Sequence, residues 1–395
     1  MKRLLLLLLL LGAAGLLFSA DFGLLVNQEI DAENNILAYN SGFVPWFSWD
    51  TGRGFSAYLS GIVSLRFRGY SDGPDMDNGL LKPAVLFELS RFSLGYRSVR
   101  GTVEGGRMFY ADAMNYTASG FFDGIRYNMP IPQGNVSVAA YYTGLQYKET
   151  AKILMTGRDI IEYVKPYEGI DDYFASKRFF AAGRWDMLLG SFSTLCMEAL
   201  IQYDLNGDGD ALNSQYGEMV FEVFPMYKFG ITLGGIFEAM QDKERDFSSA
   251  FGALARFKTE IPGSLNDEIN MAFKYTSGHW NDNFAAFVPL SAHAQGSIFS
   301  ATISGLALFS AAYSARINHV LFAEACFSYF ARTYEDPAFE GNMFGGELWA
   351  SVAWQPFIDL RVTLGAGMFL PSLGNAYPDG TDPMWKINAG ITLSL

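Results

Sequence analysis

The stretch NDEINMAFKYTSG, residues 266–278, alternates between two chemical classes at every position. A β-strand points successive side chains to opposite faces, so a period of two predicts a strand with two different faces. One face is apolar (Ile269, Met271, Phe273, Tyr275) and the other is mostly polar (Glu268, Asn270, Ala272, Lys274, Thr276). Such a strand buries its apolar face either in a protein core or in lipid.

The same alternation recurs along most of the chain, for example over 227–241, 247–258, 359–369 and 385–395. No amphipathic-helix period of any length competes with it. After the leucine-rich N-terminus, no stretch approaches the roughly 18 consecutive apolar residues of a membrane helix. Yet the composition is 50% apolar and 16% aromatic. Apolar residues scattered at every second position are typical of a transmembrane β-barrel.

The N-terminus has the layout of a secretory signal. Lys2 and Arg3 precede an unbroken leucine run from Leu4 to Leu11, and small residues stand at Ser19 and Ala20. A basic start, a short apolar run and small residues are the parts of a cleaved export signal. We therefore expect residues 1–20 to be a signal peptide and residues 21–395 to form a single exported domain.

Long and short connections alternate along the predicted strands, as in bacterial barrels with short periplasmic turns and long outer loops. Tight connections are expected near residues 50–54, 129–134, 189–191, 225–226, 261–266, 317–319 and 356–358. Longer polar connections are expected near 69–82, 110–118, 148–177, 204–215, 241–247, 277–302, 332–342 and 371–383. The pattern gives about 18 strands, or 16 if the N-terminal pair, within residues 22–49, lies outside the membrane. Residues 83–109 could supply one strand or two.

A soluble β-sandwich is the alternative to a barrel, and it would have to protect its edge strands. Aromatic residues gather near the predicted strand ends, as in the interfacial girdles of membrane barrels. They include Trp46, Trp49, Tyr141, Tyr142, Phe224, Tyr227, Trp354, Phe357 and Trp385. We therefore predict an all-β fold, a transmembrane antiparallel β-barrel in the bacterial outer membrane, with the lipid bilayer and the barrel assembly machinery as partners. The chain ends in Leu395, whereas bacterial barrels usually end in Phe or Trp.

Charged strand residues then face the lumen. The expected pore-lining residues form an acidic arc, Glu198, Glu218, Glu222 and Glu238, and a basic side, Arg66, Arg68, Arg107, Arg126, Arg256, Lys274, Arg332 and Arg361. Charges at this density require water or strict pairing, and a barrel of this size can hold an aqueous channel. A plugged lumen with salt-bridge ladders is the alternative. The charged connection 148–177 is a candidate for a loop that folds inward and narrows the pore; the alternative is a surface loop with a short helix.

The sharpest local motif is DLNGDGDALNSQ, residues 204–215. Asp204, Asn206 and Asp208 stand at positions 1, 3 and 5 of a calcium loop, but Gln215 occupies position 12, where a bidentate Glu is required. The same residues are also good turn formers. Calcium is therefore a candidate ligand, and no other cofactor is expected.

Enzymatic and nucleic-acid functions find little support. The three histidines stand in predicted loops or turns, without a paired nucleophile or metal-ligand spacing. A formal net charge of −13 argues against nucleic-acid binding. Cys196 and Cys326 lie far apart within predicted strands and are expected to be unpaired. We predict that the protein is not an enzyme.

Two segments resemble a known family. GRMFYADAMNYTASGFFDGIRY (106–127) and GGELWASVAWQPFIDLRVTLGAGMFLP (345–371) are similar to hairpins of outer-membrane porins of the OprD and alginate-export type. The leucine-rich signal also resembles spirochaetal outer-membrane proteins. The porin resemblance implies a monomeric barrel of about 18 strands that passes small polar or anionic solutes, with Arg107 and Arg126 in the lumen. The expected function is a passive channel for small hydrophilic solutes; the alternative is a non-conducting barrel that displays surface loops for adhesion or binding.

Overall fold

The structure is a computed structural model that describes residues 19–34, 36–70, 84–165, 169–207, 211–226, 228–242, 246–263, 266–279 and 284–395. Within these ranges the chain forms eighteen strands and a few short helices. The strands are β1 (Ser19–Glu33), β2 (Ile36–Asp50), β3 (Phe55–Tyr70), β4 (Ala84–Ser98), β5 (Gly101–Ala111), β6 (Ser119–Ile131), β7 (Gly134–Tyr142), β8 (Arg178–Leu188), β9 (Ser193–Asp204), β10 (Leu212–Met226), β11 (Phe229–Asp242), β12 (Phe247–Ile261), β13 (Asp267–Thr276), β14 (Leu306–Arg316), β15 (Leu321–Arg332), β16 (Met343–Phe357), β17 (Leu360–Leu370) and β18 (Met384–Ser394).

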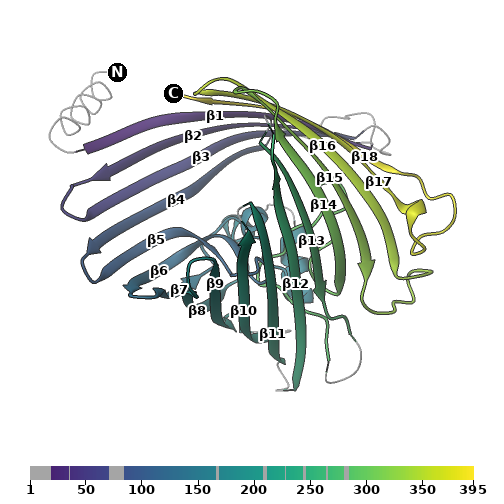
Figure 1. Cartoon of the computed structure of the whole chain (residues 1–395), viewed down its shortest axis with the longest axis horizontal. Helices are drawn as coiled ribbons and strands as arrows, with labels where there is room; N and C mark the ends of the chain where they lie inside the picture. Colours follow the sequence, from purple (N-terminus) through teal and green to yellow (C-terminus); the bar gives the residue numbers. More distant parts are fainter. Residues whose placement is uncertain are drawn as a thin grey trace.

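The strands form one closed antiparallel barrel (Figure 1). Each strand pairs with its neighbours in sequence, and β1 pairs with β18 to close the ring. At the seam, Leu24 and Leu395 exchange backbone hydrogen bonds of 2.9 and 2.8 Å. Closure removes both sheet edges, as a bilayer requires. The prediction of 18 strands is confirmed, including the N-terminal pair. Residues 83–109, for which one strand or two remained open, supply two strands, β4 and most of β5.

The connections differ from the predicted pattern in two places. The β4–β5 turn at residues 99–100 was not predicted, because the surrounding alternation continues almost without a break. The β1–β2 connection is a short turn although it lies at the end of the barrel that carries the long loops. Asn34 makes this turn possible with φ of 47°, a left-handed conformation that Asn tolerates better than most residues.

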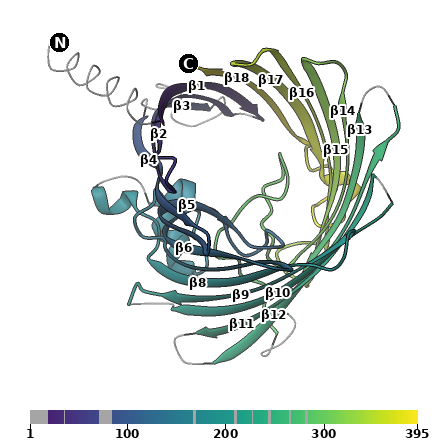
Figure 2. The same cartoon turned by 60° about the vertical axis from the view of Figure 1, so that its left-hand side comes forward.

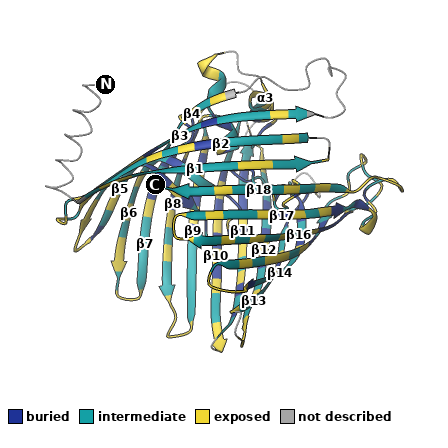
Figure 3. Ribbon diagram, turned by 90° about the horizontal axis from the view of Figure 1, so that it is seen from above, coloured by how far each residue is buried: buried dark blue, intermediate teal, exposed yellow. Residues whose placement is uncertain are grey.

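The outer surface of the barrel is apolar. Phe87, Phe237 and Phe357 are exposed over 69%, 54% and 70% of their surfaces, and similar side chains project from every strand. Exposed residues recur along the strands that form the wall (Figure 3). A band of this kind is what lipid contact demands. No helix in the described ranges is long and apolar enough to cross a membrane.

The core lies inside the barrel. Loop 112–118, between β5 and β6, and residues 284–305 of the β13–β14 connection (loop 277–305) turn into the lumen inside the ring of strands (Figure 2). Their Met114, Tyr116, Phe287 and Leu290 are at most 2% exposed. Tyr141, predicted at the membrane interface, joins this core at 1% exposure, because its side chain points inward from β7.

The β7–β8 connection carries the helices α2 (Lys148–Ala151), α3 (Gly157–Val164) and η2 (Ile170–Tyr173). Figure 2 places this helical segment on the side of the ring formed by β4, β5 and β6. A further short helix, η3 (Pro371–Leu373), follows β17.

Candidate functional site

Two carboxylates on neighbouring strands hold loop 112–118 in the lumen. Glu198 on β9 accepts the backbone N–H of Ala113 over 2.9 Å, and Glu218 on β10 accepts that of Met114 over 3.1 Å. Glu218 also accepts a hydrogen bond from the Thr117 hydroxyl at 3.1 Å. A carboxylate can enter a buried site only where donors replace water, and the loop backbone supplies them.

Two further carboxylates hold loop 277–305. Glu238 on β11 accepts the backbone N–H of Val288 over 2.9 Å. Glu347 on β16 accepts three successive backbone N–H groups, those of residues 297–299, over 2.7, 3.1 and 2.8 Å. This second loop is therefore fixed at two points on separate strands of the wall, β11 and β16.

The two loops also bind each other. The backbone N–H groups of Leu290 and Ser291 donate to the carbonyl oxygen of Thr117 over 2.7 and 3.1 Å. The Ser291 hydroxyl accepts the backbone N–H of Ser119 over 2.8 Å. Together the loops form one partition that narrows the interior.

The predicted acidic arc therefore needs correction. Glu198, Glu218 and Glu238 point inward as expected, but they are only 4%, 6% and 0% exposed, because the loops cover them. They anchor the partition, and Glu198 also lines the inner cavity near Arg126 and Arg184. Glu222 is the member of the arc that stays half-buried, near the Thr232 hydroxyl at 3.4 Å.

The pairing of β4 with β5 in the barrel wall is incomplete. These strands pair only from Phe92↔Arg107 to Ser98↔Gly101, so the outer half of β4 has no β5 partner. Gly106 adopts φ of 130° at this point, and a Cβ there would lie 2.3 Å from the Phe92 carbonyl oxygen. Only glycine allows the close approach at which the strands part.

Arg107 fills the gap at the point where β4 and β5 separate (the parting). Its guanidinium pairs with Asp123 at 2.8 and 2.9 Å and donates to the carbonyl oxygens of Leu145, at 2.9 Å, and Leu89. Arg107 is only 5% exposed. Arg107, predicted to line the pore, thus lies at a wall junction and also lines the inner cavity bordered by β1 to β4.

Side-chain partners hold four of the other predicted basic residues. Arg66 pairs with Glu149 and Arg126 with Glu104, at 2.7 and 2.8 Å, while Lys274 donates to Gln295 at 2.8 Å.

Arg332 pairs with Asp336 at 3.1 Å, packs over the Phe339 and Phe344 rings, and is 9% exposed, so it is covered near the rim. The remaining three, Arg68, Arg256 and Arg361, are exposed or half-buried.

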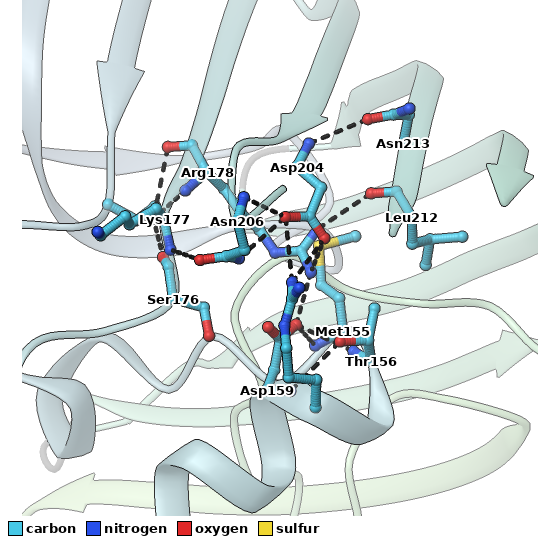
Figure 4. Close-up of polar contacts among 12 residues, drawn as sticks. Met155, Thr156, Asp159, Ser176, Lys177, Arg178, Asp204, Asn206, Leu212 and Asn213 are labelled. Atoms are coloured by element: carbon cyan, nitrogen blue, oxygen red, sulfur yellow. Dashed lines mark hydrogen bonds and ion pairs between the residues drawn. The ribbon is translucent and has the colours of Figure 1, made fainter. Parts of the chain in front are cut away.

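A buried ionic network ties the helical connection to the barrel (Figure 4). Arg178 on β8 pairs with Asp159 of α3 at 2.6 Å and with Asp204 of β9 at 3.1 Å, and all three side chains are at most 1% exposed. Arg158 pairs with Asp204 from the other side at 3.2 Å. Asp159 also completes the capping box of α3 with Thr156.

This network includes two residues of the candidate calcium loop. The carboxylate of Asp204 is shared by two arginines and by the backbone N–H of Asn206, at 2.9 Å. The side-chain oxygen of Asn206 accepts the backbone N–H of Lys177 over 3.1 Å. Asp208 lies outside the described residues. Within the described ranges no cluster of three or more His, Cys, Asp or Glu side chains has the arrangement of a metal site.

Connection 148–177, expected to narrow the pore, does so only in part. Its Lys152 carbonyl oxygen accepts the backbone N–H of Ala292 over 2.8 Å, so this end supports the partition. In α3, by contrast, Ile160, Ile161 and Val164 are exposed over 50%, 66% and 69% of their surfaces. The partition itself comes from loops that sequence reasoning assigned only to the outside.

Three cavities of about 290–300 Å³ line the inner side of the wall. One borders β1 to β4 and the parting beside Arg107, a second borders Arg126 and Arg184, and the third lies near Arg361. Charged and polar side chains line all three, which suits hydrated solutes.

No protein-family model matches this chain, and a search of curated proteins found no match. Solved structures do match. OccK1 (OpdK) of Pseudomonas aeruginosa aligns over 95% of this chain and 98% of its own, with a TM-score of 0.63 and 10% identity. OccK2 (OpdF) of the same organism, solved in complex with glucuronate, aligns over the same shares with a TM-score of 0.61 and 10% identity. OpdK solved with vanillate gives the same TM-score and identity.

The fold is that of the OprD-type porins. The resemblance inferred from residues 106–127 and 345–371 is thus confirmed at the level of the fold. Residues 106–127 lie in β5, loop 112–118 and β6, and residues 345–371 lie mainly in β16 and β17, where Glu347 anchors loop 277–305. The signal for the partition was present in the sequence as apolar residues inside a loop, in FAAFVPL (284–290).

Proposed function

We propose that this protein is an outer-membrane channel for passive diffusion of small hydrophilic solutes. The observation that carries the proposal is a closed barrel with an apolar outside and a charged inside, narrowed by a fixed partition. Lipid on one side and water on the other account for both faces. The similarity in fold to OprD-type porins supports the same function.

The proposal includes the route to the membrane. Residues 1–20 would be removed as a signal, and the barrel assembly machinery would insert residues 21–395. β1 begins at Ser19, two residues before the proposed new N-terminus. No enzymatic step and no nucleic-acid partner form part of the proposal, and the solutes would be small and polar.

A non-conducting anchor is the second candidate. The observation that favours it is the extent of the buried core inside the lumen, where both loops and part of connection 148–177 pack together. In that case the exposed apolar residues of α3 and the outer loops would carry the function.

Single-channel conductance of the refolded full chain in a planar bilayer, at two salt concentrations, separates the two. A channel gives steady openings whose ion selectivity shifts in opposite directions in Arg256→Glu and Glu222→Lys, since both residues stand on the inner wall. Asp379→Lys, in the exposed β17–β18 connection, is the matched charge control and should leave selectivity unchanged. A folded barrel that never conducts would reject the channel and leave the anchor.

A further inference from the structure

The cavity bordered by β1 to β4 differs from an anion site. It has a volume of about 300 Å³, at the small end of ligand pockets. Its lining includes six uncharged hydrogen-bonding side chains, Asn27, Asn40, Ser64, Ser90, Gln146 and Thr150, beside an apolar surface.

The positive charges that line this cavity are already paired. Its two lining arginines each have a carboxylate partner, Arg66 with Glu149 at 2.7 Å and Arg107 with Asp123 at 2.8 Å. Glu88, which also lines the cavity, adds a further carboxylate. A solute carboxylate would have to displace one of these partners or lie beside Glu88, and both cost free energy.

Three hydrogen-bond acceptors of the lining residues, by contrast, have no partner. Asn40 Oδ1, Ser64 Oγ and Gln146 Oε1 are buried atoms of lining residues, and none of the three has a hydrogen-bond partner. Ser64 and Gln146 are only 2% and 3% exposed. The Gln146 amide nitrogen donates to the Phe121 carbonyl oxygen, which fixes Oε1 as the free acceptor. An unmet buried acceptor costs about 1–3 kcal/mol, so a donor that reaches it is favoured.

Acceptors without donors point to a solute rich in O–H groups. Val44, Ile62 and Phe121 add apolar surface to the same cavity, which suits the C–H faces of a polyol or sugar ring. Neutral hydroxyl groups can satisfy the amide oxygens without disturbing the two ion pairs.

We propose that this cavity is a subsite for a small, uncharged, hydroxyl-rich solute of about hexose size. The proposal rests on the proposed channel function in that the solute reaches the cavity through the lumen. It assigns the interior of this barrel a neutral solute, whereas the related folds were solved with glucuronate and vanillate.

The test is calorimetric titration of the refolded full chain with D-glucose and, separately, with D-glucuronate, which differ mainly by one carboxylate. We expect heat from glucose and weaker binding of glucuronate. Gln146→Met should weaken glucose binding about tenfold, the equivalent of one lost hydrogen bond of about 1.4 kcal/mol. Gln202→Met is the matched control, because Gln202 is equally buried and unpartnered but stands on β9, outside this cavity.

Ser64→Ala is a second, smaller change and should also weaken glucose binding if Gln146→Met fails to fold. Stronger binding of glucuronate, no heat from glucose, or equal loss in Gln146→Met and Gln202→Met would each overturn the subsite. The channel is judged separately by conductance. Glucose binding without conduction would reject the channel and keep the site, and conduction without glucose binding would do the reverse.

Discussion

Glu347 gives the sharpest test of how the partition is held. This carboxylate is 3% exposed and accepts three backbone N–H groups from residues 297–299. Glu347→Gln keeps the shape of the side chain. It leaves an amide oxygen for the two donors now at Oε2 and turns an NH₂ group toward the N–H of Ser297, so one hydrogen bond is lost and two donors face each other.

The size of the effect follows from these contacts. A hydrogen bond to a charged group contributes about 1.5–3 kcal/mol, and the two surviving bonds also lose their ionic character. We expect loop 277–305 to be less firmly attached by roughly 3 kcal/mol, which is about two orders of magnitude in its detached population.

Thiol labelling measures that population. Ile298, which is 5% exposed, is replaced by Cys in a chain whose native Cys196 and Cys326 are changed to Ser. A water-soluble maleimide should then label the Cys far faster in Glu347→Gln than in the parent. Glu324→Gln is the matched control, because Glu324 shares the inward face on neighbouring β15 and is exposed.

Labelling of Glu347→Gln no faster than of Glu324→Gln would refute the anchoring role. Gly296→Ala perturbs the same contact independently, since its Cβ would lie 2.6 Å from Glu347 Oε2. Gly296→Ala should raise the labelling rate as well. A rate equal to that of the parent would count against the close approach of Gly296 to Glu347.

Three further predictions concern the β7–β8 connection and the ionic network that ties it to β8 and β9. Arg178→Met should destabilise the barrel by about 3–5 kcal/mol, because it leaves Asp159 and Asp204 buried without their shared cation; urea unfolding in detergent measures this, and an unchanged midpoint would contradict it. Deletion of 153–172 should raise single-channel conductance, because it removes Ile153 and Met155, which pack into the core inside the barrel, and an unchanged pore would exclude that role. Titration with millimolar calcium should give no heat, because the Asp204 carboxylate is already held by two arginines; measurable heat would revive the calcium site.

The strand architecture could be predicted because it depends on a local rule. Period-two alternation assigns each residue to a face, and it correctly gave the N-terminal pair, although it left open whether residues 83–109 supply one strand or two. It could not show that β4 and β5 pair over only half of β4, since that parting depends on one glycine, Gly106, and on Arg107 filling the junction. Neither changes the alternation that surrounds it.

The contents of the lumen could not be predicted in the same way. Loop 277–305 meets Glu238 and Glu347 through its backbone N–H groups, and every non-proline residue carries the same group. The amino-acid types of the loop therefore do not reveal which of its residues make these backbone contacts. The apolar run 284–290 was the available signal, because a loop in water has no reason to carry it.

An inward carboxylate in a barrel can bind a hydrated solute, pair with a lumenal cation or receive the backbone of a loop. Alternation treats these three cases alike, since all put the same side chain on the same face. Exposure separates them here: Glu222 remains half-buried beside the lumen, whereas Glu218, four residues away on the same strand, is only 6% exposed beneath Met114 and Thr117. Charge patterning along a strand thus locates the inner wall of such a protein, and the selectivity of the pore depends on the subset of those charges that the loops leave uncovered.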